Sequence, residues 1–187
     1  ILVLCSYLHY HKLVNTIDIA SSYLAGHSLG EYSALVAANS LSITEALKLV
    51  RKRGELMESA PNGSMSAIMG LDNNVISEIC LIASHGDNSH VQCANLNSPN
   101  QTVISGHDDA VVRAQDLCIA KGAKRAIKLK VSIASHSKLM LSAVDEFQKT
   151  LESVTFKMPD INIIHNVSVN SSTIDAVIND SSRPTTA

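Results

Sequence analysis

The sequence predicts an α/β fold, and three observations support this prediction. A short apolar segment, 23–25, leads into Gly26-His27-Ser28-Leu29-Gly30, and a helix-forming segment follows at once, which is the order of strand, tight turn and helix. Further along, segments with strand-like alternation are interleaved with segments of helical periodicity. The chain has 187 residues, of which 45% are hydrophobic and 17% charged, so it can bury a core as one domain or as one domain with a smaller inserted lobe.

Two helices are predicted after the tight turn. The first covers 31–38, and Asn39 is its expected stop, since asparagine tolerates the left-handed conformation that ends helices. Ser42-Ile43-Thr44-Glu45 then forms a capping box, in which the serine and glutamate side chains bond the first turn of a helix. This second helix is expected to extend to about residue 60, where Pro61-Asn62-Gly63 interrupts it.

Residues 64–131 differ in character and predict an inserted lobe. The expected elements are a strand at 65–71, a helix at 73–83, strands at 91–95 and 101–105, a helix at 108–121 and a strand at 125–131. This β-α-β-β-α-β order is the split β-α-β arrangement of a ferredoxin-like lobe. We therefore expect a body formed by 1–63 and 132–187, which carries the serine turn, and a subdomain formed by 64–131.

The remainder of the chain returns to the body. A turn at 132–136 precedes a predicted helix at 138–151 and a predicted strand at 161–164. From residue 170 on, Ser, Thr, Asn and Asp dominate, and we expect this end to be loose.

Composition excludes several classes of function. The formal net charge is −2 and the basic residues are scattered, which argues against binding to nucleic acid or to an anionic membrane surface. The apolar segment 1–8 is too short to span a bilayer, resembles no secretory signal and predicts a buried helix; its abrupt start indicates a piece of a longer protein. The four cysteines are far apart in apolar stretches typical of free buried thiols, which favours a cytoplasmic location.

Ser28 is the candidate nucleophile, because a serine on a strand-to-helix turn is raised clear of the sheet beside backbone N–H groups that can bind an oxyanion. A serine hydroxyl needs a base, and eight histidines are available. His136 is the first candidate, since it lies in the turn by which the chain returns from the lobe, and His165, at the end of a strand, is the second. His27 is expected to pack or orient the turn. The others are expected on surfaces, in loops or at a helix cap: His9, His11, His85, His90 and His107.

Arg53 lies on the second predicted helix, beside its apolar stripe. A guanidinium beside an apolar stripe is stabilised by an anionic partner. It could be held by an acidic side chain in a structural ion pair, or its apolar stem could pack while the charge reaches solvent. The functional alternative is a fork that binds a substrate carboxylate through two hydrogen bonds.

Several of these motifs together resemble the malonyl-CoA:acyl carrier protein transacylases, in the same order and at similar spacing. The similar segments are 26–36, 53–57, 95–101, 105–107 and 131–136, so the resemblance extends over about 24–166. It implies an α/β hydrolase-like body with a ferredoxin-like subdomain. That implication agrees with the order of elements predicted above.

The resemblance also implies a role for each candidate residue. Ser28 would attack the thioester of malonyl-CoA and become malonylated, with His136 as general base and later general acid. Arg53 would bind the malonyl carboxylate, and the N–H of Leu29 would donate to the oxyanion. The phosphopantetheine thiol of acyl carrier protein would then accept the malonyl group, as in fatty acid biosynthesis, with no metal or cofactor required.

The sequence departs from that family at both ends, and other functions stay open. The family's N-terminal Gly-Gln-Gly-Ser-Gln-type segment, which supplies a second oxyanion donor, has no counterpart before Ile1, so we expect this chain alone to be weakly active or inactive. One alternative is the acyltransferase module of a polyketide or fatty acid synthase, with methylmalonyl as a possible substrate because Ser135 is small. A serine esterase of the α/β-hydrolase class, and a lobe that only docks a carrier protein, are the others.

Overall fold

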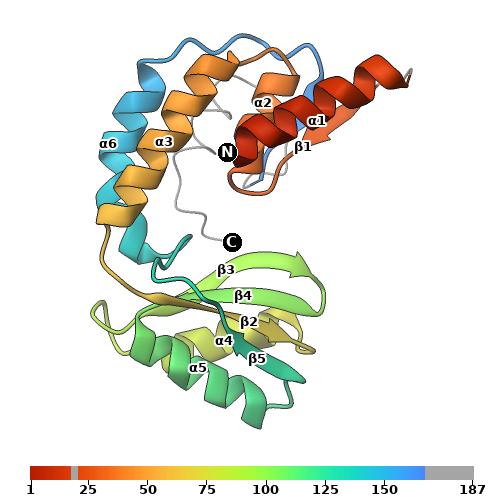
Figure 1. The fold of residues 1–187 in the computed structure, drawn as a ribbon. Coiled ribbons are helices and arrows are strands. Elements are labelled where there is room, and N and C mark those ends of the chain that lie inside the picture. Colours follow the sequence, from red (N-terminus) through yellow and green to blue (C-terminus); the bar gives the residue numbers. More distant parts are fainter. Residues whose placement is uncertain (18–20, 167–187) are drawn as a thin grey trace. The chain divides into compact units, whose positions relative to one another are not determined.

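A computed structural model describes residues 1–17 and 21–166. It divides into two compact units, each described by itself below. The first contains residues 1–55 and the described residues from Glu146 on, and the second contains residues Leu56–Asp145. Both units contain helices and strands, so the chain is a mixed α/β protein, as expected (Figure 1). No helix within the described ranges combines the length and the apolar character that crossing a membrane requires.

The first unit contains a small parallel sheet. Strand β1 (Tyr23–Ala25) pairs with β6 (Asn162–Ile164), and the register places Leu24 opposite Ile163 and Ala25 opposite Ile164. Because the two strands are parallel, the segments that follow them leave at the same edge of the sheet. One of those segments is the predicted serine turn, so its surroundings come from both ends of the chain.

Helices α2 (Gly30–Ala37) and α3 (Ile43–Ser59) follow the serine turn closely in sequence. Asn39 has φ 56°, which confirms it as the stop after α2. The capping box is also confirmed: Ser42 Oγ accepts from Glu45 N at 3.2 Å and donates to Glu45 Oε2 at 2.9 Å. In Figure 1, α3 runs beside α6 (Leu141–Glu152), and an ion pair between Lys52 and Glu146 joins them.

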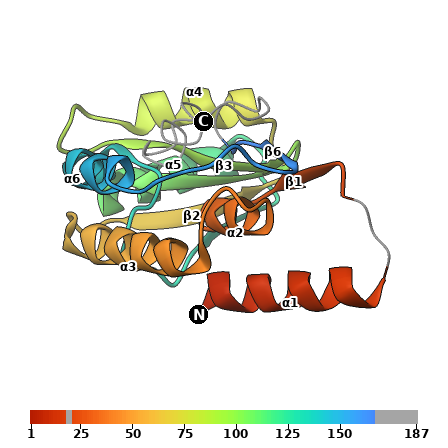
Figure 2. The same cartoon turned by 90° about the horizontal axis from the view of Figure 1, so that it is seen from above.

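Helix α1 (Leu2–Thr16) differs from the prediction of a buried helix. Only Val3 is buried, whereas Leu2 is 70% exposed and Leu8 is 56% exposed. Cys5 is exposed as well, so the expectation of four buried thiols is wrong for this one. The reason is that α1 packs against α2, which covers one side of it, and Figure 2 shows its other side without a neighbouring helix.

The second unit contains a four-stranded sheet with two helices. Its elements are β2 (Ser64–Met69), α4 (Asn73–Ala83), β3 (Val91–Ser98), β4 (Gln101–Gly106), α5 (Asp108–Ala120) and β5 (Arg125–Lys128). The strand order is β3-β4-β2-β5, and each neighbouring pair is antiparallel. The order of elements agrees with the sequence prediction, although β5 ends at Lys128 instead of residue 131.

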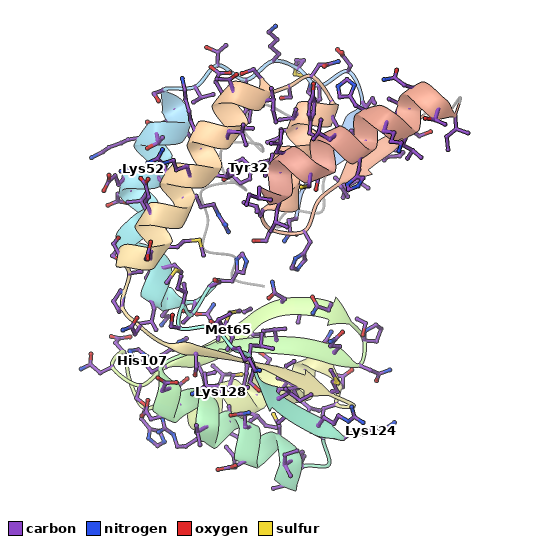
Figure 3. The ribbon with its side chains drawn as sticks, viewed as in Figure 1. Tyr32, Lys52, Met65, His107, Lys124 and Lys128 are labelled. Carbon is purple, nitrogen blue, oxygen red and sulfur yellow. The ribbon has the colours of Figure 1, made fainter. Side chains whose placement is uncertain are left out.

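The two faces of this sheet carry different side chains because residues alternate along β2. Ile68 faces α4 and α5 and lies in the main core with Ile76, Ile104 and Val111. Met65 faces the opposite way, into a smaller apolar cluster (Figure 3). After β5, the chain forms a short 3-10 helix, η1 (Lys138–Met140), before α6 begins.

Candidate active site

Ser28 lies in a tight turn between β1 and α2. Its φ is 52°, in the left-handed region that residues other than glycine rarely adopt. The turn closes at once into helix: Gly30 N donates to His27 O at 2.9 Å, and Glu31 N donates to Ser28 O at 3.1 Å. This strained backbone at the end of a strand is the arrangement called a nucleophile elbow.

The two glycines of the pentapeptide have different roles in this turn. A Cβ on Gly26 would lie 2.1 Å from the carbonyl C and O of Gly30, so only glycine fits there. A Cβ on Gly30 would meet no atom within 4 Å. Neither glycine has a positive φ; the left-handed strain lies on Ser28 itself. The first glycine therefore permits a close backbone approach, and the second is not required by packing.

Arg53 reaches the serine from α3. Its Nη2 donates to Ser28 Oγ at 3.1 Å, and both side chains are partly buried. Of the acidic side chains in the described ranges, none lies within ion-pair distance of Arg53. The contact favours the substrate-binding interpretation over the structural ion pair, because the guanidinium keeps further N–H donors for an anion next to the hydroxyl.

Tyr32, labelled in Figure 3, belongs to α2 and is 2% exposed. Burial raises the pKa of its phenol far above the usual range, Arg53 lowers it by a smaller amount, and Glu31 adds to the increase. The phenol is therefore neutral at any physiological pH. Tyr32 does not neutralise Arg53, and the positive charge beside Ser28 stays available to a ligand.

Leu29 occupies the N-cap position of α2, with φ −56° and ψ −28°. No acceptor for its N–H is found in the part of the chain that the structure describes. The N-terminus of a helix carries partial positive charge, which stabilises an anion placed there. Leu29 N–H is thus in a suitable place for an oxyanion that develops next to Ser28.

Two residues after β6 contact the turn and the helix that follows it: His165, which the sequence singled out as the second candidate base, and Asn166, which it did not. Ser28 N donates to Asn166 Oδ1 at 3.3 Å. His165 is 1% exposed, and its Nδ1 lies 2.7 Å from Glu31 Oε1. The second candidate base is therefore buried and hydrogen-bonded to a carboxylate. Because β1 and β6 were both predicted, a parallel pairing of the two could have indicated that residues 165–166 lie near the turn.

His136 belongs to the second unit. It is 9% exposed and has φ 60°. The following residue, Ser137, caps η1: its Oγ accepts from Leu139 N at 3.3 Å and donates to Ala134 O at 2.7 Å. Within the described ranges, three residues other than glycine have positive φ: Asn39, which ends a helix, and the two candidate catalytic residues, Ser28 and His136. Such strain is concentrated at functional positions.

No group of three or more His, Cys, Asp or Glu side chains in residues 1–17 and 21–166 is arranged to hold a metal ion. The groups near Ser28 are instead a hydroxyl, a guanidinium and a helix N-terminus. Together they can hold an acyl compound that carries its own negative charge.

Comparison with known proteins identifies the family. Residues 12–184 match the family described as the acyl transferase domain. The malonyl CoA-acyl carrier protein transacylase of Salmonella typhimurium is 45% identical over 160 residues, which cover 84% of this chain and 51% of that protein.

Solved structures agree. That of the malonyl CoA-acyl carrier protein transacylase from Coxiella burnetii has a TM-score of 0.91 and 38% identity, covering 98% of this chain and 60% of that one. A complex of a type II PKS acyl-carrier protein with its malonyl-transacylase has a TM-score of 0.93 and 39% identity, again over 98% of this chain and 60% of the other. The chain spans about half the length of the curated relatives it matches. Since the family match extends over most of its residues, the chain belongs to the acyl transferase domain family.

Proposed function

We propose that the protein transfers the malonyl group of malonyl-CoA to the phosphopantetheine thiol of acyl carrier protein, through a malonyl ester on Ser28. The observation that carries the proposal is the hydrogen bond from Arg53 Nη2 to Ser28 Oγ, at 3.1 Å. It places a fixed positive charge beside the nucleophile. An acyl group with a carboxylate close to its carbonyl carbon is the substrate that such a pair suits.

Malonyl has the required dimensions. One methylene separates its thioester carbonyl from its carboxylate, so a carboxylate bound by the Arg53 fork leaves the carbonyl carbon within reach of Ser28 Oγ. Acetyl lacks the carboxylate. Succinyl has one more methylene and would have to fold back to make both contacts. The side chain that touches the nucleophile therefore favours a short diacid over both alternatives.

Each step of the proposed reaction uses a named group. Ser28 Oγ forms a bond to the thioester carbon while its proton passes to His136, the proposed general base. Leu29 N–H donates to the oxyanion, and CoA leaves as the thiol with the proton from His136. The carrier-protein thiol then attacks the ester and gives its proton to His136. His136 passes a proton to Ser28 Oγ as the ester bond breaks. No metal or redox cofactor takes part in this scheme.

Support for the partners comes from similar proteins. The relative from Salmonella typhimurium is named for malonyl CoA and acyl carrier protein, and one similar structure contains an acyl-carrier protein. We extend both substrates to this protein on the basis of that similarity. Fatty acid biosynthesis in the cytoplasm is the corresponding setting.

We also propose the finer fold assignment: an α/β hydrolase-like body at 1–63 and 132–187, and a ferredoxin-like subdomain at 64–131. The elbow after a strand supports the first part, and the β3-β4-β2-β5 order with antiparallel neighbours supports the second. The two segments at the proposed boundaries lie next to each other within the second compact unit, where Gly63 N donates to Ser132 O at 3.1 Å.

A polyketide acyltransferase is the second candidate. The similar structure with a type II PKS acyl-carrier protein favours it specifically. Methylmalonyl retains the carboxylate and the carbonyl that Arg53 and Ser28 would contact, so these two residues do not separate it from malonyl. A serine esterase is less well supported, because ordinary esters need no cation beside the nucleophile.

The test incubates the protein with malonyl-CoA, acetyl-CoA or succinyl-CoA and measures the rate of acylation of Ser28 by intact-protein mass spectrometry. We expect malonyl-CoA to react fastest and Arg53→Ala to slow that reaction roughly 10- to 150-fold, as expected for loss of hydrogen bonds to a charged group of about 1.5–3 kcal/mol. Acetylation should change little. Arg51→Ala is the matched control, since Arg51 lies on the same helix in an exposed pair with Glu55. Equal rates for the three thioesters would refute the proposal.

A further inference from the structure

The left-handed backbone of Ser28 has to be held by something. A residue other than glycine in this region costs about 1–3 kcal/mol and persists only where its surroundings over-determine it. The hydrogen bonds from Gly30 N and Glu31 N fix the chain after Ser28. On the side before it, the Ser28 N–H donates to Asn166 Oδ1 at 3.3 Å, across 138 residues of sequence.

The position of Asn166 follows from the parallel sheet. Ala25 is opposite Ile164 in the register, so the two strands end together. Two further residues lead from Ile164 to Asn166, and three lead from Ala25 to Ser28. The side chain of Asn166 thus bridges the two segments that leave the same edge of the sheet.

His165 anchors the segment 165–166 through a contact with helix α2. His165 is 1% exposed, and its Nδ1 lies within hydrogen-bond distance, 2.7 Å, of Oε1 of Glu31, which is 4% exposed. Glu31 lies in the first turn of α2, three residues after Ser28. A buried hydrogen bond to a carboxylate is strong and costly to break. The pair therefore ties 165–166 to the helix that begins at the elbow.

We propose that Asn166 is a positioning residue, which keeps Ser28 in its left-handed conformation through the backbone N–H and is itself anchored by the His165–Glu31 pair. Its action differs from that of Arg53, which contacts the hydroxyl. Without the Asn166 acceptor, Ser28 can relax toward negative φ, which turns Oγ away from Arg53 and from Leu29 N–H. Acylation then slows although the groups that bind substrate are intact; this second consequence rests on the proposed function.

The first test needs no substrate. Amide hydrogen exchange of Ser28, measured by NMR on the ¹⁵N-labelled chain, should accelerate at least tenfold in Asn166→Ala. It should stay near the original rate in Asn166→Asp, which keeps an acceptor oxygen at the same place. Asn162→Ala is the matched control, because Asn162 is an exposed asparagine on β6. Asn166→Ser, which shortens the side chain but keeps it polar, replaces the alanine variant if that one does not fold.

The second test follows acylation of Ser28 by malonyl-CoA. The maximal rate should fall about tenfold in Asn166→Ala and recover in Asn166→Asp, while the half-saturating concentration stays within about twofold. Unchanged exchange at Ser28 in the alanine variant, or equal exchange in the alanine and aspartate variants, overturns the positioning role. If the unmodified chain is protected at Ser28 but is acylated by acetyl-CoA as fast as by malonyl-CoA, the proposed function fails and the positioning role stands.

Discussion

Replacing Gly26 by alanine would place a methyl group inside the turn that carries Ser28. The added Cβ would lie 2.1 Å from Gly30 C and O and 2.4 Å from Glu31 N, whereas ordinary contacts begin at 3.4 Å. All three atoms are backbone, so no rotation of a side chain relieves the overlap, and the start of α2 has to move by more than 1 Å, as the difference between those distances shows. Overpacking of a well-packed site costs about 1–3 kcal/mol, and we expect the upper end here.

Thermal unfolding measures this cost. A loss of about 3 kcal/mol corresponds to a melting temperature lower by roughly 6–12 °C for a chain of this size. Gly30→Ala is the matched control: its Cβ meets nothing within 4 Å, and alanine is a better helix former than glycine by up to about 1 kcal/mol. Its melting temperature should be unchanged or higher. A melting temperature of Gly26→Ala within 1 °C of that of the original chain would correspond to a loss of only ~0.3 kcal/mol. That result would show that the close backbone approach at Gly26 does not require glycine.

Two further predictions concern features outside the site. Ser42→Ala removes the N-cap hydrogen bond to Glu45 N and should cost about 1 kcal/mol in urea unfolding; an unchanged midpoint would show that the capping box adds no stability. A thiol reagent at pH 8 should label Cys5 alone in the folded chain and all four cysteines in denaturant, since the others are buried: Cys80, Cys93 and Cys118. Burial also raises the pKa of the Cys118 thiol to about 11, with a smaller contribution from Cys93, so rapid labelling of Cys118 in the folded chain would contradict this packing.

Local features of the fold could be predicted from the sequence because their causes are local. The capping box at Ser42 and the left-handed Asn39 set helix limits within a few residues of themselves. The exposure of α1 could not be predicted in this way. Its leucines resemble those of a core helix. Whether they are buried depends on how many other elements pack against the helix, and the sequence of a short apolar segment does not contain that information.

The residues of the candidate site also fall into those that the local sequence could identify and those that it could not. Ser28 could be identified from five consecutive residues, but the choice between two roles for Arg53 required its contact with Ser28 Oγ. Asn166 was given no role, and Glu31 was regarded only as part of a helix, because their contacts join positions more than 130 residues apart. The pentapeptide pattern also does not distinguish its two glycines: the structure shows that packing requires glycine at Gly26 and that the strained backbone lies on Ser28.

The φ of 52° at Ser28 also limits which amino acids can supply the attacking group. Threonine has the same hydroxyl, but its second substituent on Cβ crowds the peptide on either side when the backbone is left-handed. Cysteine, with a single substituent on Cβ, fits as serine does. Two side chains that both carry a hydroxyl are thus distinguished by a methyl group and one torsion angle, before any substrate arrives.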